Sequence, residues 1–562
     1  MSTKERYDRR LNKLKNERET WVNHWKDIND YLVPRRGRFL TSERNKGDKK
    51  NDKIIDSEAT QAVNILVSGL MSGVTSPARK WFRLVTPDPD LREFGPVKEW
   101  LNMVETVMYD VFTASNLYTV LPYVYEEMAL YGTAAIHQLD DFESVARFQV
   151  YPTGEYSIAQ DHHYQVNTIY REVEQTVEQL VTKYGYEKCS GHVKRAYDKG
   201  DMDLWIETVH LIEPNPDGDS DSPFTKDMPY RSVCYEKGAD GPEDFLEVSG
   251  YPEFPVFAPR WHIQPPDVYG RSPGMDCLGD VKQLQDQQKK KSQAIAKLVN
   301  PPMVGPSSLK NQRMSTLPGD VTFVDTAQGA VGFQPAYRVE PRLNDMLVDI
   351  QDVRDRIRRA FYADLFLLMT SSDRRQITAT EIDSRESEKL LVLGPLMGRL
   401  DRHLLSPLCE KTFKRITSLG LVPPAPQELQ GSELKTEFLS VMAMAQKAQG
   451  VLGIQEAAGF VGNMAQIQPD VIDKMDFDQA VDEFAAMRGL PPGVIRNDDD
   501  VVELRDQRQQ QMQMQQMAAM GQQAAEGAKT LSDTQTNERN MLTDILGGNM
   551  GTAPPTADEM AI

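Results

Sequence analysis

Two long helices are predicted around a proline-rich segment in the middle of the chain. The first covers residues 275–298, which contain no proline and begin after Ser272-Pro273, because proline suits the first turn of a helix. The second covers about 341–362, with apolar residues at steps of three and four. Prolines and glycines interrupt the residues between them. We therefore expect a helical hairpin that carries a small lobe, with short strands near 321–324 and 331–333.

An amphipathic helix is predicted at the N-terminus, over residues 3–33. It ends at Pro34, and a strongly basic run follows up to Lys53. This run has two open interpretations: a solvated loop, or a segment that contacts phosphates or an acidic neighbouring subunit. The apolar face of the helix consists of Leu11, Leu14, Trp21, Trp25, Ile28 and Leu32.

Further helices are predicted before residue 135, and short strands after residue 143. Asp56-Ser57 precedes a helix rich in alanine, glycine and serine, which a second backbone can approach closely, and two more helices follow at about 96–115 and 119–131. Between 143 and 262, β-branched and aromatic runs separated by turn residues predict a mainly antiparallel sheet. The predicted strands lie near 148–151, 165–170, 204–209 and 232–235, with one helix at about 174–184.

The C-terminal third reads as mainly helical. A polar loop is followed by a helix from Thr378 to about Gly420, with a break expected at Gly394-Pro395. Shorter helices are predicted at about 433–448, 454–465 and 476–488. A Gln- and Met-rich helix then runs from about 498 to 528, and its weak apolar periodicity makes it marginal as a monomer. Residues 529–562 are expected to be disordered. The fold class is thus α+β and predominantly helical.

Composition narrows the functional classes. The chain has 562 residues, a net charge of −19, 40% hydrophobic and 26% charged residues, which is typical of a globular protein of several domains. Its acidity does not favour an exposed nucleic-acid-binding surface. The four cysteines are far apart and are expected to be buried thiols in a reducing compartment. The charged N-terminus predicts no secretory signal, and no apolar run is long enough to predict a membrane span.

Catalytic motifs are missing from the sequence. There is no G-x-x-x-x-G-K-[ST] loop, no H-E-x-x-H and no G-x-S-x-G, so we predict no catalytic residue, metal or cofactor. The adjacent pair His162-His163 is expected to lie in a surface turn rather than to bind a metal. The abundant carboxylates keep a metal-dependent nuclease open as an alternative.

The second long helix has an ordered charge pattern. Its aspartates, which include Asp349 and Asp352, come mainly before its arginines, which include Arg356 and Arg359. This order complements the helix dipole. It fits either a solvated, salt-bridged face or packing against a rotated copy of the same chain.

An ordered set of local motifs resembles the portal, or head-to-tail connector, proteins of short-tailed, podovirus-type bacteriophages. The resemblance spans about residues 5–500, and no single motif in it is specific. It rests on the Trp21/Trp25 helix ending at Pro34, Asp56-Ser57-Glu58-Ala59, Gly69-Leu70-Met71-Ser72-Gly73-Val74-Thr75-Ser76-Pro77, Trp81-Phe82, Tyr131-Gly132-Thr133-Ala134, Tyr151-Pro152-Thr153-Gly154-Glu155-Tyr156 and Tyr269-Gly270-Arg271-Ser272-Pro273-Gly274.

The resemblance implies a homo-oligomeric ring, typically a dodecamer, at one capsid vertex of the virion, assembled in the host cytoplasm. Double-stranded DNA would be packaged and ejected through it. Its implied partners are the terminase large subunit, then tail adaptor and tail tube proteins, together with major capsid and scaffolding proteins, and no membrane. A nuclease of the packaging apparatus and a non-ring minor capsid or scaffolding protein are the alternatives.

The portal architecture divides the subunit into wing, stem, clip and crown, sometimes with a helical barrel. The implied boundaries are an N-terminal helix and basic loop at 1–54, the wing at 55–270, a first stem helix at 271–299, the clip at 300–340, a second stem helix at 341–363, a tunnel loop at 364–378, a wing helix at 379–429, the crown at 430–497, the Gln/Met-rich helix or barrel at 498–528 and a disordered tail at 529–562.

Site residues follow from this division. The DNA channel candidates are basic residues of the tunnel loop and the stem, and the subunit-interface candidates are charged residues of the second stem helix. Residues of the lobe are the candidates for docking terminase and adaptor proteins. These sets are Arg374, Arg375, Lys289, Lys290 and Lys291 for DNA; Asp349, Asp352, Arg356 and Arg359 for the interface; and Lys310, Arg313, Phe323 and Phe333 for the clip.

Overall fold

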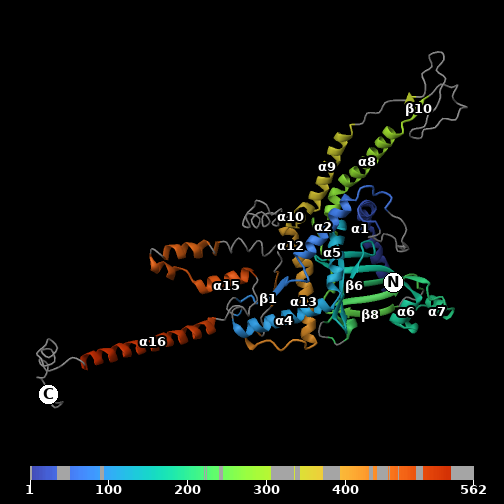
Figure 1. The fold of residues 1–562 in the computed structure, drawn as a ribbon. Coiled ribbons are helices and arrows are strands. Elements are labelled where there is room, and N and C mark those ends of the chain that lie inside the picture. The colour runs from blue at the N-terminus through green and yellow to red at the C-terminus, as the bar shows by residue number, and fades with distance from the viewer. Residues whose placement is uncertain are drawn as a thin grey trace. The chain divides into compact units, whose positions relative to one another are not determined.

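The computed structural model divides the chain into two compact units, Met1–Leu490 and Pro491–Ile562. Helices and sheets are mixed, as expected for an α+β protein (Figure 1). The structure describes residues 3–34, 51–88, 91, 94–219, 222, 224–239, 245–304, 334–335, 342–370, 393–429, 434–438, 453–454, 456–465, 468–488 and 498–532.

A five-stranded antiparallel sheet lies in the first half of the chain, with strand order β4-β5-β6-β7-β8. Each strand pairs with the next one along the chain, so the sheet is a meander. The strands predicted near 165–170, 204–209 and 232–235 are confirmed as β5, β6 and β7, and the one predicted near 148–151 is confirmed as part of β3 (Val145–Tyr151), which lies in another sheet. The strands are β4 (Tyr156–Gln160), β5 (Val166–Thr176), β6 (Trp205–Pro214), β7 (Tyr230–Glu236) and β8 (Phe245–Tyr251).

Helices cover both faces of this sheet. Helix α1 (Thr3–Tyr31) packs its buried Tyr7 and Leu11 on the face that carries Val233. Helices α6 (Val177–Tyr184) and α7 (Gly191–Asp198) pack with Cys234, the next residue of β7, whose side chain points to the other face. The sequence predicted α6 but not α7. Helix α7 is short and has only two buried residues, so its apolar signal is weak.

The main hydrophobic core joins a second sheet to a group of helices. This sheet has the order β3-β2-β9, and both pairings are antiparallel. Among the helices is α2, the predicted helix rich in small residues, and the two helices predicted after it are also confirmed. The elements are β2 (Ala135–Asp141), β3 (Val145–Tyr151), β9 (Val256–Phe257), α2 (Glu58–Gly73), α4 (Gly95–Ala114), α5 (Leu117–Tyr131), α12 (Gly394–Leu400) and α13 (Ser406–Ser418).

Helix α12 begins at Gly394, where the sequence predicts a break, and has Pro395 in its first turn. A π-helical turn, Asp401–Leu405, joins α12 to α13 directly before Pro407. Proline lacks a backbone N–H and its ring crowds the preceding turn, so the wider turn accommodates it without a steric clash. The segment 378–392 lies outside the described residues.

The predicted helical hairpin is present as α8 (Pro273–Val299) and α9 (Leu343–Ala360). Ser272 caps α8 through its side chain, which accepts a hydrogen bond from the Met275 N–H at 3.0 Å. Figure 1 shows the two helices side by side, running away from the elements around their bases. The two-residue strands β10 (Met303–Val304) and β11 (Gln334–Pro335) pair at the far end. The strands predicted at 321–324 and 331–333 lie outside the described residues.

Three predictions about single elements are wrong where the structure describes them. Residues 364–370, predicted as the start of a loop, are helical in α10 (Ala363–Thr370), because Phe366 is buried in the core. Within the predicted helix 433–448, Lys435–Phe438 form strand β12, which pairs with β1 (Phe82–Val85) and adds an Arg83–Glu437 ion pair. Residues 529–532, predicted as the start of the disordered tail, are the last residues of the helix that begins at Asp498.

The remaining C-terminal elements agree with their predictions. Residues 456–465 are helical, and α15 covers Phe477–Arg488. Helix α16 covers Asp498–Ser532 in the second unit. All four cysteines are buried and free, as predicted. In the described ranges, no helix is both long enough and apolar enough to cross a membrane.

Candidate functional site at the helical hairpin

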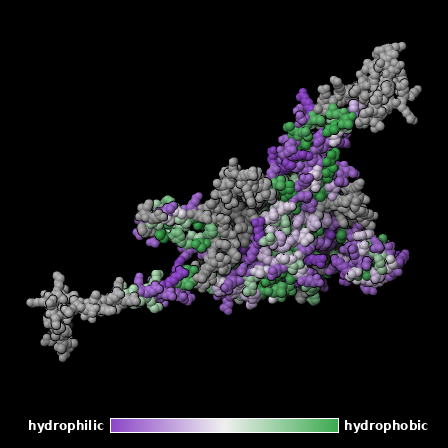
Figure 2. Space-filling view, viewed as in Figure 1, coloured by the Kyte–Doolittle hydropathy of each residue, from purple (hydrophilic) through white to green (hydrophobic). Residues whose placement is uncertain are grey.

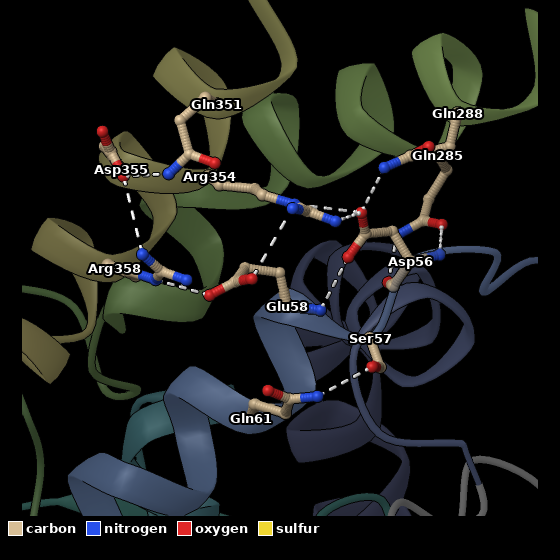
Figure 3. A network of polar contacts seen from close by, with 10 residues as sticks. All are labelled: Asp56, Ser57, Glu58, Gln61, Gln285, Gln288, Gln351, Arg354, Asp355 and Arg358. Atoms are coloured by element: carbon tan, nitrogen blue, oxygen red, sulfur yellow. Dashed lines mark hydrogen bonds and ion pairs between the residues drawn. The ribbon is translucent and has the colours of Figure 1, made fainter. Parts of the chain in front are cut away.

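The base of the α8–α9 hairpin is joined to the N-terminus of α2 by a network of buried and partly buried polar contacts (Figure 3). We call it the base network. Its acidic members come from the residues that begin α2, and its amide and guanidinium members come from the two hairpin helices. It consists of Asp56, Glu58, Gln285, Gln288, Arg354 and Arg358.

Asp56 receives hydrogen bonds from both helices of the hairpin. Gln288 Nε2 of α8 donates to Asp56 Oδ2 at 2.6 Å, and Arg354 Nη2 of α9 donates to the same oxygen at 2.8 Å. The Glu58 N–H donates to Asp56 Oδ1 at 3.0 Å, which caps α2 in place of the Ser57 side chain. Asp56 is only 8% exposed, so one buried carboxylate connects three helices.

Gln285 and Glu58 complete the base network. The Gln285 side chain accepts from the Ile55 and Asp56 N–H groups and donates to the Asp56 carbonyl. Arg358 Nε donates to Glu58 Oε1 at 2.6 Å, and Arg354 Nε lies 3.8 Å from Glu58 Oε2. Arg354 and Arg358 are four residues apart, so they occupy the same face of α9 and reach the two acidic residues together.

The charges of the base network favour its ionised state. Burial by itself would raise the pKa of Asp56, but hydrogen bonds from Arg354, the Glu58 N–H and Gln288 hold that pKa below its usual value. The hydrogen bond to Glu58 raises the pKa of Arg358. The ionised Asp56 carboxylate is therefore the stable form at neutral pH.

Further out than Gln288 of α8 and Ile350 of α9, the described part of the hairpin has no buried residue. The last buried residue of α8 is Gln288, and the first of α9 is Ile350. Between these residues and the far end, both helices expose apolar side chains, which include Val299 at 81% and Val348 at 72%. Figure 2 shows apolar patches among polar ones along the hairpin. The other exposed apolar residues here are Ile295, Leu298 and Leu347.

The three predicted stem lysines lie next to this exposed part. Lys289 and Lys290 are exposed, whereas Lys291 is half-buried. Lys290 forms an ion pair with Asp286 one turn earlier, at 2.6 Å. Consecutive helix positions are about 100° apart, so the three lysines do not share one face.

The predicted interface residues of α9 differ in their surroundings. Arg356 contacts Asp280 of α8 at 2.9 Å and Asp352 of its own helix at 3.4 Å, so it links the two helices of the hairpin. Asp349 accepts a hydrogen bond from Gln287 of α8. Arg359 is exposed and has no ion pair within the described part of the chain.

The other predicted site residues lie outside the described residues. They are Arg374 and Arg375 of the predicted tunnel loop and Lys310, Arg313, Phe323 and Phe333 of the predicted clip. His162 and His163 lie in the β4–β5 turn with ring centroids 3.8 Å apart. Across the described ranges, no group of three or more His, Cys, Asp or Glu side chains is arranged to hold a metal ion.

Sequence reasoning missed Asp56, Glu58, Gln285 and Gln288 as members of a site. The four-residue spacing of Arg354 and Arg358, and the Asp56-x-Glu58 pair before a helix, are the only local signals for it. Asp56 and Arg354 are 298 residues apart, so no local pattern could pair them.

Comparisons with known proteins place the whole chain in context. The model of the family "Bacteriophage head to tail connecting protein" matches residues 4–495. The portal protein of Salmonella phage epsilon15 is 45% identical over 543 residues, covering 96% of this chain and 98% of that protein. A probable portal protein of Bordetella phage BPP-1 is 43% identical over 536 residues, covering 95% and 96%.

A structural comparison adds a weaker likeness. A chain from the virion of a native gene transfer agent particle matches 77% of this chain and 95% of its own length. Its sequence identity is 10% and its TM-score is 0.32, which is too low to establish a common fold.

Proposed function

Because the chain belongs to the family of bacteriophage head to tail connecting proteins, we propose that it forms a homo-oligomeric ring, the portal, at one vertex of the capsid. Double-stranded DNA is packaged and ejected through this ring. Two relatives named as portal or probable portal proteins match over nearly the whole chain and support the proposal. The ring is a dodecamer by analogy with portal proteins in general.

The proposed partners and location follow from this role. The ring is part of the virion, where major capsid and scaffolding proteins surround it during assembly. The terminase large subunit docks on it during packaging, and tail adaptor and tail tube proteins replace terminase afterwards. The protein acts as a conduit and a docking platform without catalysing a reaction.

In this proposal α8 and α9 are the stem, and the residues between them, 300–340, are the clip on which terminase and adaptors dock. Lys310, Arg313, Phe323 and Phe333 are its candidate contacts. The segment that follows α10 is the tunnel loop, so the loop begins at 371 rather than 364. The sheets with α2, α4, α5 and α13 form the wing, residues 430–497 form the crown, and α16 is the barrel helix.

One observation supports contact between neighbouring copies of the chain through the hairpin. Both hairpin helices expose apolar side chains beyond the base network, in the last turns of α8 and the first turns of α9, which lie at the same end of the hairpin. Burying a Val or Leu side chain is worth roughly 1.5–3 kcal/mol. A neighbouring copy in a ring would cover Ile295, Leu298, Val299, Leu347 and Val348.

Charge along the hairpin fits subunit contact and a DNA channel. Arg359 is the strongest of the proposed interface residues, because Arg356 is already paired within the hairpin. Asp349 and Asp352 lie on the same helix and are its candidate counterparts in the next copy. Lys289, Lys290 and Lys291, repeated around a ring, would give bands of positive charge in an otherwise acidic channel. Arg374 and Arg375 would do the same in the tunnel loop, so duplex DNA can slide without tight binding.

Electron microscopy of the purified protein tests the ring directly. We expect rings with an axial hole, and we expect Val348→Asp to shift the protein toward monomers, because a charge would be buried at the proposed contact. Val248→Asp is the matched control, since Val248 is also exposed but lies on strand β8. Monomers of the unmodified protein under all conditions would contradict the ring. Equal loss of rings in both variants would contradict the hairpin as its contact.

A further inference from the structure

Helix α9 ends at the hairpin base, and a two-residue turn leads from it directly into α10. The turn is at Phe361 and Tyr362, and Tyr362 has a φ of 55°. This left-handed conformation is unfavourable for a bulky side chain and persists only where surrounding contacts enforce it. We call this turn the elbow.

Contacts on both sides hold the elbow. Phe361 is fully buried, and the Tyr362 ring lies 6.3 Å from the Trp261 ring. The Tyr362 carbonyl accepts from the Leu365 N–H at 3.1 Å, so the left-handed residue itself begins α10. The Trp261 carbonyl is in turn fixed by Arg399 Nε at 2.7 Å.

Helix α2 contacts both arms of the elbow. Its N-terminal end holds α9 through Asp56 and Glu58 of the base network (Figure 3). Near its other end, Gly69 faces the Phe366 ring of α10 so closely that a Cβ atom on Gly69 would lie 2.3 Å from the ring. Glu58 and Gly69 are eleven residues apart, so a rigid rod of roughly 17 Å spans the two contacts.

We propose that α2 is a brace that fixes the angle of the elbow, with Asp56 and Glu58 as the positioning residues for α9 and Gly69 as the seat for α10. A tilt of the hairpin is then transmitted to α10, and through α10 to the chain that follows it. This inference rests on the proposed function for its biological meaning, because α8 and α9 are the proposed stem and the segment after α10 is the proposed tunnel loop. In this inference the base network sets the orientation of α9 in addition to stabilising the fold.

Hydrogen exchange, followed by mass spectrometry of the full-length protein, tests the brace. In Arg354→Gln the Asp56 carboxylate loses its guanidinium partner, so one of the two charged contacts that hold α9 against α2 is removed. We expect exchange in peptides covering 363–370 to become at least about tenfold faster, since hydrogen bonds to a charged group stabilise by more than a factor of ten. Exchange in β5 and β6 should not change.

Arg356→Gln is the matched control on the same helix. Arg356 also forms a short ion pair, but its partner is Asp280 of α8, so this contact does not involve α2. We expect Arg356→Gln to leave exchange in 363–370 within about twofold of the unmodified protein. If both variants accelerate α10 equally, general loosening of the hairpin explains the effect and the brace is wrong.

Charge reversal separates an interaction from a loss of packing. Glu58→Arg places like charges against Arg358 and should accelerate exchange in α10, and adding Arg358→Glu should restore most of the protection. If Arg354→Gln unfolds the chain so that β5 and β6 also exchange faster, Glu58→Gln provides the milder test with the same expected pattern.

Unchanged exchange in α10 for both Arg354→Gln and Glu58→Gln would overturn the proposal. The readout lies within one chain and requires neither DNA nor other phage proteins. A protein that forms no rings but shows the predicted exchange pattern would contradict the proposed portal function and leave the brace intact. Rings without the predicted exchange pattern would support the portal function and contradict the brace.

Discussion

At the scale of single residues, Asp56 is the most connected polar group at the hairpin base. Its carboxylate is buried, which disfavours the charge, yet it accepts bonds from α2, α8 and α9. Removing one partner of such a group leaves the other buried without compensation, which costs more than the pair contributes. The three helices are therefore coupled through the ionised state of one side chain.

This coupling predicts a pH dependence. The folded-state pKa of Asp56 lies below its usual value, so its stabilisation is fully present above the unfolded pKa of about 3.9 and is lost as the pH falls through the lower, folded pKa. At neutral pH we expect Asp56→Asn to lower the free energy of unfolding by about 1.5–3 kcal/mol. The difference from the unmodified protein should shrink as the pH is lowered below 4.

Thermal unfolding at a series of pH values measures this difference. Asp345→Asn is the control, because Asp345 is on the same hairpin but is largely exposed, and its substitution should have little effect at any pH. A difference between Asp56→Asn and the unmodified protein that stays constant from neutral to acidic pH would refute the assigned charge state.

At the scale of elements, the small residues of α2 decide how closely other helices approach. Gly69 is buried against the Phe366 ring, whereas a Cβ on Gly73, in the last turn of the same helix, would meet no atom within 4 Å. Glycine normally weakens a helix by roughly 0.5–1 kcal/mol relative to alanine. Its presence at position 69 is explained by the packing of α10, which propensity alone would not reveal.

Two glycine substitutions in α2 are therefore expected to act in opposite directions. Gly69→Ala should lower the free energy of unfolding by about 1–3 kcal/mol, because the aromatic ring must move. Gly73→Ala should leave stability unchanged or raise it by up to about 1 kcal/mol. Chemical denaturation of the two variants side by side measures this. A destabilised Gly73→Ala, or a neutral Gly69→Ala, would disagree with the packing described for α2.

Whether an element could be predicted from the sequence depends on whether its contacts are local or distant. Helices α1 and α9, which have an apolar stripe, and α8, which begins after Ser272-Pro273 and has no later proline, were predicted to within a few residues. The strand β12 was predicted as a helix because its pairing with β1 is a contact between distant segments. Helix α10 was partly predicted as loop because its burial depends on the groove that Gly69 leaves in α2. Local periodicity does not contain either interaction.

At the scale of the whole molecule, α16 exposes apolar side chains within the described part of the chain. It belongs to the second unit, and Met512, Met514, Met517 and Met520 are 59–69% exposed. A helix in a protein gains its stability mainly from packing an apolar face against other elements. These four methionine side chains are exposed rather than packed. Contact with α16 of other copies in a ring would supply such packing.

A peptide of residues 498–532 is expected to reflect this dependence on other copies. Its helix content by circular dichroism should be low in dilute solution and should rise with peptide concentration. Replacing Met517 and Met520 by alanine raises intrinsic helix propensity but removes apolar surface, so it should weaken the concentration dependence. Helix content that is high and independent of concentration would contradict packing between copies as its source.

The sequence by itself determined the α+β class, the hairpin, the N-terminal helix and the ordered set of motifs that pointed to the portal proteins, because periodicity, caps and prolines act within a few residues. Only the tertiary structure decided that Asp56 joins both hairpin helices, that α10 is a helix seated on Gly69, and that apolar side chains such as Val299 and Val348 are exposed on the hairpin. Those features depend on groups up to 298 residues apart, whose proximity is set by the packing of the whole core.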